Sequence, residues 1–312
     1  MSVKRILITG SGGFVGTNLT RSLIKQYHIS GIDLHQSGLS KLNEFYKWNE
    51  LEHLQGYDTI IHLAGIAHNI HNSSEPQTYY DVNIDLTKKI FDFFIRSESR
   101  MFIFFSSVKA VADSLDNKIL TEGFIPNPKT PYGKSKLAAE RHILMQRIAA
   151  NKKVIILRPC MIHGPGNKGN LNILYKYVKR GFPYPLGCFK NLRSFLSVQN
   201  LVYIVTGLIE NPVSSGTYNV ADDDSVSTNE IIELIAGTLH KKPWVWNCPL
   251  SLVNFIAKSG DLFNMPFNSD RLNKLTGTYI VSNSKLKNAL GIDKLPVSSR
   301  DGLIRTFESF SK

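Results

Sequence analysis

Nearly continuous apolar runs alternate with amphipathic stretches along the first half of the chain. Runs typical of strands buried on both faces of a parallel sheet occur at residues 5–9, 28–32, 58–65, 101–105 and 154–157. Between such runs, as over residues 80–94, apolar positions recur every three or four residues, which is typical of helices. The alternation predicts an α/β protein with a doubly wound parallel sheet of the Rossmann type.

The second half of the chain alternates less regularly. We expect residues 1–165 to form a Rossmann domain, with its sheet completed by segments within residues 194–222. Residues 217–220 predict a return strand of that main sheet. The remainder, residues 166–312, is then mainly a substrate-binding region with mixed structure.

Two features mark the C-terminal part of the chain. Ser227, followed three residues later by Glu230, predicts a capping box at the start of a helix that runs to Leu239. Residues 243–285 then mix loops with aromatic side chains, and we interpret them as a small cover over a substrate, although an ordinary second core would use the same residues. The aromatic residues are Trp244, Trp246, Phe255, Phe263 and Phe267.

The first apolar run leads directly into a glycine-rich turn. Gly10, Gly13 and Gly16 form the pattern G-x-x-G-x-x-G, and a helical pattern follows them. Glycines at these points let the backbone turn tightly and approach a pyrophosphate, whose charge is stabilised at the helix N-terminus. We therefore expect the turn, together with Phe14 and Val15, to bind a dinucleotide.

Two strand ends extend the predicted cofactor site. Asp33 follows the second run, where a carboxylate accepts hydrogen bonds from the adenosine ribose hydroxyls and repels a 2′-phosphate. This favours NAD over NADP; the alternative is a turn aspartate. Leu63, Ala64 and Gly65 end the third run, and the small residues among them allow a cofactor to approach the backbone, whereas His62 is expected to be a packed strand residue.

A Tyr-x-x-x-Lys pattern supplies the candidate chemistry. Tyr132 and Lys136 lie a turn apart on one face if Pro131 opens a helix. A neighbouring ammonium lowers the pKa of a phenol, so Tyr132 could exchange a proton with a substrate oxygen. Tyr175 and Lys179 have the same spacing, but the first pair follows the glycine turn, Asp33 and a serine pair at the end of the fourth run.

With these motifs in order, the chain resembles an extended short-chain dehydrogenase/reductase of the sugar-nucleotide epimerase/dehydratase group. The resemblance implies that Ser107, Tyr132 and Lys136 are catalytic and that Tyr132 and Lys136 also bind the cofactor, Lys136 by holding the nicotinamide ribose. Ser106 is expected to be a capping serine. It also implies that Asn83 ties its helix to neighbouring strands. Segments 106–109, 131–140 and 157–193 resemble the branch that acts at C4 of UDP-linked N-acetylamino sugars.

The same resemblance suggests where a substrate binds. Asn170 and Arg193 match positions that hold the UDP part of the substrate in related epimerases, and an arginine can pair with a diphosphate through its planar fork. The alternative for Arg193 is a surface ion pair. We include Leu171 and Arg271 among the expected substrate-binding residues, so the expected partner is a UDP-sugar.

The residues also narrow the reaction. Dehydratases of the group carry Asp-Glu after the catalytic serine, whereas this chain has Val108-Lys109, which argues against dehydration. Reduction of a UDP-4-keto-6-deoxy-N-acetylhexosamine, as in surface polysaccharide precursor synthesis, is the interpretation that the branch favours. A 4-epimerase with tightly bound NAD would use the same residues, and a catalytically inactive relative is a third alternative.

Composition changes this picture little. The 312 residues carry a formal charge of +12, but Lys and Arg are scattered, so we expect no nucleic-acid partner. The three cysteines have no metal-binding spacing, and we expect free thiols and no metal. Neither a signal peptide nor a membrane-spanning run is evident, which predicts a cytoplasmic protein without integral membrane association. The resemblance implies a homodimer.

Overall fold

A seven-stranded parallel sheet forms the centre of the protein. The computed structural model describes residues 3–66, 76–263 and 268–311. The strand order is β10-β7-β5-β4-β1-β2-β3, and each neighbouring pair is parallel. The strands are β1 (Arg5–Thr9), β2 (His28–Ile32), β3 (Glu44–Tyr46), β4 (Thr59–His62), β5 (Met101–Phe105), β7 (Lys153–Pro159) and β10 (Gly216–Val220). The predicted doubly wound fold is confirmed.

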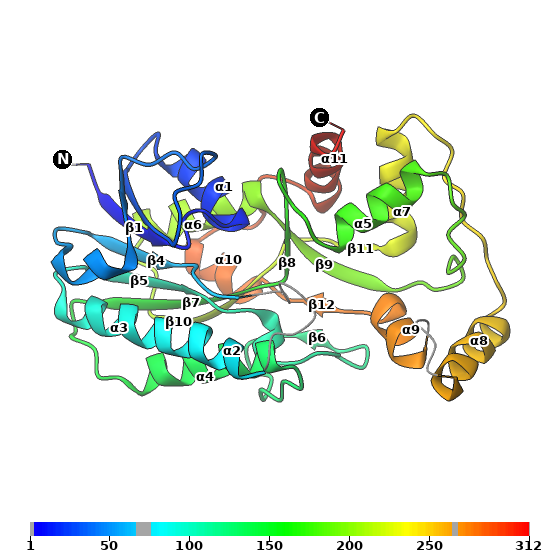
Figure 1. The fold of residues 1–312 in the computed structure, drawn as a ribbon, viewed down its shortest axis with the longest axis horizontal. Coiled ribbons are helices and arrows are strands. Elements are labelled where there is room, and N and C mark those ends of the chain that lie inside the picture. Colours follow the sequence, from blue (N-terminus) through cyan, green and yellow to red (C-terminus); the bar gives the residue numbers. More distant parts are fainter. Residues whose placement is uncertain (1–2, 67–75, 264–267, 312) are drawn as a thin grey trace.

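Helices cover both faces of this sheet (Figure 1). One face carries α1 (Phe14–Leu23) and α6 (Val198–Glu210), and the other carries α3 (Leu86–Arg96) and α4 (Pro131–Met145). Side chains of a strand alternate between faces, so Ile6 and Ile8 pack with α1 and α6, whereas Leu7 packs with α3 and α4. Nearly continuous apolar strands are the consequence.

A smaller mixed sheet lies beside the main one. It contains β8 (Met161–His163), β9 (Leu192–Ser197) and β11 (Ser225–Ser227), with β9 parallel to β8 and antiparallel to β11. The helices α5 (Asn170–Lys179), α7 (Thr228–Thr238) and α11 (Ser299–Ser309) enclose a separate apolar cluster with it. The division of the chain into domains at residue 165 stays a prediction.

The predicted capping box at α7 is half right. Ser227 caps the helix by accepting a hydrogen bond from the Glu230 backbone N–H. The Glu230 carboxylate does not return to the cap, because it pairs with Arg300 on α11 at 2.5 Å. Tertiary contact with α11 therefore replaces the second half of the local motif.

Further elements lie along the chain outside the two sheets and the helices already described. They are η1 (Trp48–His53), α2 (Pro76–Tyr80), the π-helical turn η2 (Asp81–Asp85), η3 (Val108–Ala110), β6 (Ile119–Leu120), α8 (Leu250–Leu262), α9 (Ser269–Thr276), β12 (Ile280–Val281) and α10 (Ser284–Leu290). β12 pairs with β6. Within the described residues, no helix is long and apolar enough to cross a membrane.

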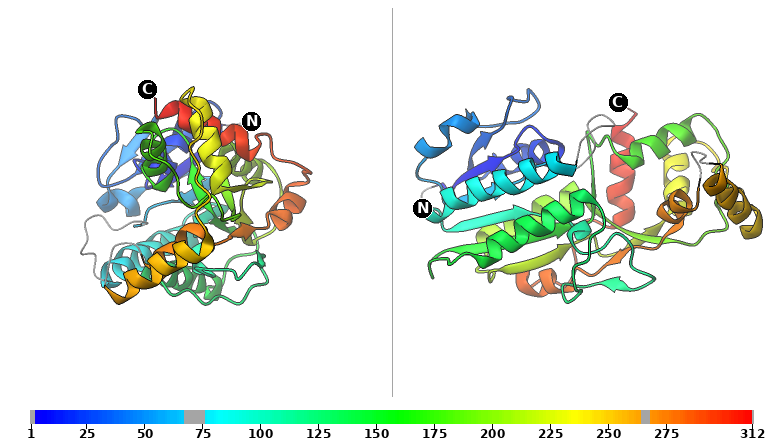
Figure 2. Two further views of the ribbon diagram at one scale, coloured as in Figure 1. Left: turned by 90° about the vertical axis from the view of Figure 1, so that its right-hand side faces the viewer. Right: turned by 60° about the horizontal axis from the view of Figure 1, so that its bottom comes forward.

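The predicted cover spans α8 and α9, which lie at the end of the molecule away from the N-terminal strands (Figures 1 and 2). Trp244, Trp246, Phe255 and Phe263 have exposed side chains. Phe267 lies outside the described residues.

Candidate active site

The glycine turn brings two strand ends together. Gly10 has a positive φ of 71°, and a Cβ on it would lie 2.7 Å from the Ala64 backbone nitrogen. A Cβ on Gly16 would overlap the Gly10 carbonyl oxygen and lie 2.7 Å from the Ser11 Cα. Glycine at these two positions therefore allows β1, α1 and the end of β4 to meet closely.

The turn also leaves the start of α1 open to a ligand. Gly13 is the N-cap of this ten-residue helix, and it supplies no side-chain cap to the first-turn N–H groups, which include those of Phe14 and Val15. Asp33 lies beside the turn and accepts hydrogen bonds from the Gly12 N–H at 2.8 Å and the Leu34 N–H at 2.7 Å. The positive end of the helix suits a pyrophosphate, and the remaining acceptor capacity of Asp33 suits a ribose diol. The residues therefore fit NAD.

The end of β4 is held against this turn by several polar contacts. Ala64 donates its N–H to Thr9 Oγ1, and Asn83 binds both backbone groups of Ile66 and donates to Ser135 Oγ. Asn83 thus connects the end of β4 with α4. A Cβ on Gly65 would lie 3.3 Å from Lys136 Nζ, so the predicted residues 63–65 lie next to the predicted catalytic lysine.

His62 is a packed strand residue, as predicted. It is fully buried, and its ring nitrogens contact Thr9 Oγ1 at 2.7 Å and Thr87 Oγ1 at 2.9 Å. Burial, together with the nearby charge of Lys136, holds the pKa of His62 well below its usual value. A neutral, enclosed imidazole with both nitrogens engaged has a structural role here.

Ser107 and Tyr132 meet at the carboxyl end of β5. Thr130 caps α4 and Pro131 opens it, which places Tyr132 in the first turn beside η3. Ser107 Oγ accepts a hydrogen bond from the Lys109 N–H, so its own O–H can donate, and Ser107 hydrogen-bonds to the Tyr132 hydroxyl. Two hydroxyl groups thus converge at the sheet edge where α/β proteins bind ligands.

The structure corrects the expected effect of Lys136 on Tyr132. Burial raises the pKa of Tyr132, the Ser107 hydrogen bond opposes that change, and Tyr79, whose ring lies 6.3 Å from that of Tyr132, adds to it. Lys136 does not contribute, because its Nζ is turned to the Phe105 carbonyl oxygen at 3.0 Å. The prediction that Lys136 lowers the Tyr132 pKa is therefore wrong for the arrangement in the structure.

Lys136 itself lies in an unusual environment for an ammonium. Its side chain is buried, and its Nζ lies 5.1 Å from the centre of the Phe104 ring. Burial lowers the pKa of Lys136 to about 8, and the negative charge of Glu140 acts in the opposite direction. Lys136 is thus close to titrating at physiological pH.

A buried polar cluster below Lys136 was not predicted from the sequence. Glu140 follows Lys136 by one turn of α4 and pairs with Arg158 of β7 through hydrogen bonds of 2.9 and 2.5 Å. Ser106 also donates to Glu140, so it is not the simple capping serine that we expected. The cluster connects α4 to the ends of β5 and β7, directly next to Ser107.

The second Tyr-x-x-x-Lys pair lies elsewhere. Tyr175 is buried in the apolar cluster of the smaller sheet, where its ring packs against Phe307 and Phe310. Its hydroxyl lies 2.7 Å from Ser311 Oγ on the C-terminal segment. The structure therefore separates the two pairs as the order of motifs predicted, and Tyr175 is a core residue.

The predicted substrate residues are divided among three elements. Asn170 is exposed at the start of α5, whereas the neighbouring Leu171 side chain is buried in the core. Arg193 of β9 donates to the backbone oxygens of Lys274 and Gly277 at the end of α9, so it does not form the surface ion pair considered above. Arg271 is exposed on α9, and the substrate roles of all four stay predictions.

A group of cations near Ser107 was also not predicted from the sequence. Lys109 packs over the Tyr279 ring at 4.2 Å and donates to the Asp113 backbone oxygen. Burial lowers the pKa of Lys109, Asp113 opposes this, and the positive charges of Arg193 and Lys274 lower it further. Positive charge is thus concentrated beside the site by Lys109, Arg193 and Lys274. These residues belong to η3, β9 and α9, which are far apart in the sequence and come together only in the fold.

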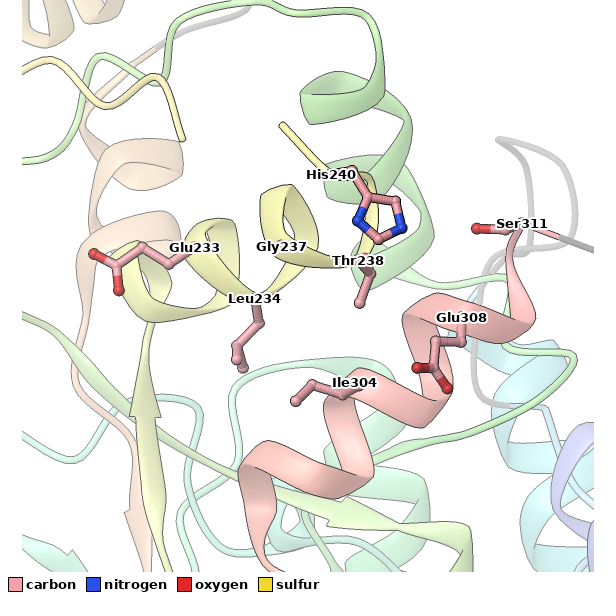
Figure 3. A pocket seen from close by; sticks show the side chains of 8 residues that line it. All are labelled: Glu233, Leu234, Gly237, Thr238, His240, Ile304, Glu308 and Ser311. Carbon is pink, nitrogen blue, oxygen red and sulfur yellow. The ribbon is translucent and has the colours of Figure 1, made fainter. Parts of the chain in front are cut away.

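The pocket in Figure 3 lies away from these residues. It is formed between α7 and α11 and is lined by Glu233, Leu234, Gly237, Thr238, His240, Ile304, Glu308 and Ser311. None of the predicted site residues belongs to it. In the part of the chain that the structure describes, no group of three His, Cys, Asp or Glu side chains could hold a metal ion.

The fold and these contacts define a class of protein. A parallel sheet whose edge presents an uncapped helix N-terminus binds a dinucleotide, and a tyrosine hydroxyl paired with a serine beside it can transfer protons to and from a substrate oxygen. These are the properties of an oxidoreductase of the short-chain dehydrogenase type.

The chain belongs to the NAD dependent epimerase/dehydratase family, whose model matches residues 6–221. It is therefore an NAD-dependent enzyme. It is 32% identical to a UDP-glucose 4-epimerase of Vibrio cholerae over 98% of this chain and 95% of that protein. It is 29% identical to N-acetyl-alpha-D-glucosaminyl-diphospho-ditrans,octacis-undecaprenol 4-epimerase of Escherichia coli O157:H7, over 90% and 84% of the two chains.

Solved structures agree on the fold. MoeE5 in complex with UDP-glucuronic acid and NAD matches with a TM-score of 0.77 at 21% identity, covering 98% of this chain and 99% of that chain. The match extends through the smaller sheet as well as the main one, since it covers nearly all of both chains.

Proposed function

We propose that the protein is an NAD-dependent 4-epimerase of a UDP-linked hexose or N-acetylhexosamine. The observation that carries the proposal is the contact between the Ser107 and Tyr132 hydroxyls at the end of β5, with Lys136 one turn further along α4. The similarity to two 4-epimerases along most of the chain supports the choice among the reactions of the family.

The chain's own residues account for the proton transfers. The C4 oxygen of the sugar would lie within reach of Tyr132 and Ser107, Tyr132 in its phenolate form would accept the C4 hydroxyl proton, and the resulting phenol would return that proton after the keto-sugar has turned over. Ser107 stabilises charge on the oxygen by donating its O–H. Bound NAD would supply the hydride acceptor and donor for C4. We expect Lys136 to hold its ribose.

Dehydration is disfavoured by the residues after Ser107. Val108 is buried, and the Lys109 ammonium is directed to Asp113 and Tyr279, so this position offers no acid/base pair for removal of a C5 proton and of the C6 hydroxyl. The second candidate is reduction of a UDP-4-keto-6-deoxy-N-acetylhexosamine for a surface polysaccharide precursor. Segments 106–109, 131–140 and 157–193 favour this reduction, because they resemble the branch of the family that acts at C4 of UDP-linked N-acetylamino sugars.

One experiment separates the two functions. The purified protein is tested for NAD that copurifies, and then receives UDP-N-acetylglucosamine or UDP-glucose without added cofactor. Isomerisation without net cofactor consumption supports the epimerase. Consumption of NADH or NADPH one-for-one with a UDP-4-keto-6-deoxy-N-acetylhexosamine, without isomerisation of the first two sugars, would replace the proposal by the reductase.

A matched pair of variants tests the assigned residues. Tyr132→Phe should lower turnover by about 10²–10⁴-fold while cofactor binding remains, because only the hydroxyl is lost. Tyr175→Phe removes the same atom from the other Tyr-x-x-x-Lys pair and should leave turnover unchanged. Equal turnover in the two variants would refute the role of Tyr132. A homodimer and a cytoplasmic location remain further expectations, the first open to sedimentation analysis.

A further inference from the structure

One short segment carries both Ser107 and Asp113. It runs from the end of β5 through η3, and both of its ends contact the start of α4. Ser107 hydrogen-bonds to the Tyr132 hydroxyl, and the Asp113 carboxylate binds the residues directly before α4. The way in which this segment is fastened to α4 therefore decides where the two hydroxyls meet.

Asp113 holds the start of α4 through three hydrogen bonds. Its Oδ2 accepts from the Lys129 N–H at 2.7 Å and from the Thr130 N–H at 3.3 Å, and its Oδ1 accepts the Thr130 hydroxyl at 3.2 Å. Thr130 is in turn the N-cap of α4 and accepts a hydrogen bond from the Gly133 N–H at 3.2 Å. A continuous chain of hydrogen bonds thus leads from Asp113 to the first turn of the helix, which contains Tyr132.

Close backbone contacts join the same segment to the helix and to the residues before it. A Cβ on Gly133 would overlap the Lys109 carbonyl oxygen, so η3 and the first turn of α4 meet without room for a side chain. The Asn127 N–H also donates to the Val111 carbonyl oxygen at 2.8 Å. The start of α4 cannot move away from the segment without losing these contacts together.

The segment is also fixed on the side away from α4. Lys109 donates to the Asp113 backbone oxygen at 3.0 Å and packs over the Tyr279 ring at 4.2 Å. Tyr279 donates its hydroxyl to the Ala112 carbonyl oxygen at 2.8 Å and is bridged to Arg193 of β9. Asp113 is therefore a firmly placed group against which the start of α4 is set.

We propose that Asp113 is a positioning residue for Tyr132: its carboxylate sets the start of α4 so that the Tyr132 hydroxyl lies within hydrogen-bond reach of Ser107. The inference rests on the proposed function, in which both hydroxyls act on one substrate oxygen. A carboxylate that engages N–H groups with one oxygen and a hydroxyl with the other fixes orientation as well as distance. This matters because a displacement of about 1 Å at the reacting groups can lower the rate about a hundredfold.

The test compares kcat with KM for the C4 reaction, measured as isomerisation or as reduction. Asp113→Ala removes all three hydrogen bonds and should lower kcat about 10–100-fold, while KM for the UDP-sugar and NAD binding stay unchanged. Asp113→Asn keeps one oxygen for the backbone N–H groups and should lose less. Asp223→Ala is the matched control and should turn over as the unaltered protein does, although its carboxylate also accepts three hydrogen bonds, from Asn283, Lys287 and Leu295.

A double substitution separates positioning of Tyr132 from a general structural role. If Asp113 acts through the Tyr132 hydroxyl, Asp113→Ala should lower turnover little further when it is added to Tyr132→Phe. Loss by the same factor with and without that hydroxyl, or unaltered turnover of Asp113→Ala, would overturn the proposal. NAD binding reports that the main sheet is folded. Should Asp113→Ala fail this check, Thr130→Val removes the hydroxyl between Asp113 and Gly133 and carries the same expectations.

Failure of the proposed function is seen separately. Full turnover of Tyr132→Phe would overturn both the role of Tyr132 and this inference. Loss of turnover in Tyr132→Phe, combined with full turnover in Asp113→Ala, would overturn the inference alone.

Discussion

The Glu140–Arg158 pair should contribute both to the stability of the fold and to the protonation state of Lys136, and Glu140→Gln tests both. The side chains of Glu140 and Arg158 are 1% and 7% exposed, and two hydrogen bonds of 2.9 and 2.5 Å join them. The substitution keeps the size of the side chain and removes its charge. The Arg158 guanidinium is then left as a buried cation with an amide for a partner.

The expected loss of stability is large for a single substitution. Removing one partner of a buried ion pair costs about 3–5 kcal/mol, because the other charge remains desolvated. The pair between Arg96 and Glu52 provides a matched control: its side chains are 63% and 54% exposed at a distance of 2.9 Å. Glu52→Gln should lower the free energy of unfolding by about 1 kcal/mol or less. Urea unfolding of the two variants under one set of conditions measures the difference.

A second measurement separates a positioning role of Glu140 from a purely structural one. The charge of Glu140 raises the pKa of Lys136, so its removal should lower that pKa further below about 8. If turnover needs the charged lysine, the alkaline limb of its pH profile moves to lower pH in Glu140→Gln and stays in place in Glu52→Gln. Equal stability of both variants, together with an unmoved limb, would refute this account of the pair.

Further predictions concern the glycine turn, with a control glycine in α7, and Lys136. Gly16→Ala should greatly weaken NAD binding in a titration, because the new methyl group overlaps the Gly10 oxygen. The control Gly237→Ala has open space around its new Cβ in α7 and should raise the free energy of unfolding by about 0.5–1 kcal/mol. Burial lowers the pKa of Lys136 to about 8, so between about pH 8 and 10 Lys136 is neutral in the folded protein but still protonated in the unfolded chain. In this range the free energy of unfolding should therefore rise with pH, by up to about 1.4 kcal/mol per pH unit from Lys136. Lys136→Met should remove that part of the pH dependence in urea unfolding, and an unchanged slope would contradict it.

Most of the main sheet could be predicted because its strands are buried on both faces. A continuous apolar run such as 101–105 leaves few alternatives to an internal strand, and β5 has those bounds. β3 could not be predicted in this way. It has three partly buried residues, Glu44–Tyr46, and it becomes a strand only by pairing with β2 at the edge of the sheet. The return of Glu230 to the cap at Ser227 was wrongly predicted for a related reason, since Arg300, distant in the sequence, pairs with Glu230.

The chemistry of the site was less accessible than its location. The glycine turn and Ser107, Tyr132 and Lys136 are defined by local spacing, which a sequence displays directly. The pKa of Tyr132 depends instead on burial and on Tyr79, which lies on another helix. The contact of Arg193 with the end of α9 likewise joins residues far apart in the chain. Such electrostatic surroundings have no signature in local sequence.

The ridge formed by Tyr132, Lys136 and Glu140 shows why the familiar spacing of the first two residues is incomplete. The three residues are spaced four apart on α4, and their side chains become more buried from Tyr132 to Glu140. An ammonium in that position tends to lose its proton, and Glu140 opposes this. Glu140 can itself remain inside only because Arg158 and Ser106 satisfy its oxygens. The charge of Lys136 is thus supported by groups at the ends of β5 and β7. A search for Tyr-x-x-x-Lys alone finds the predicted catalytic residues without the residues that stabilise this charge.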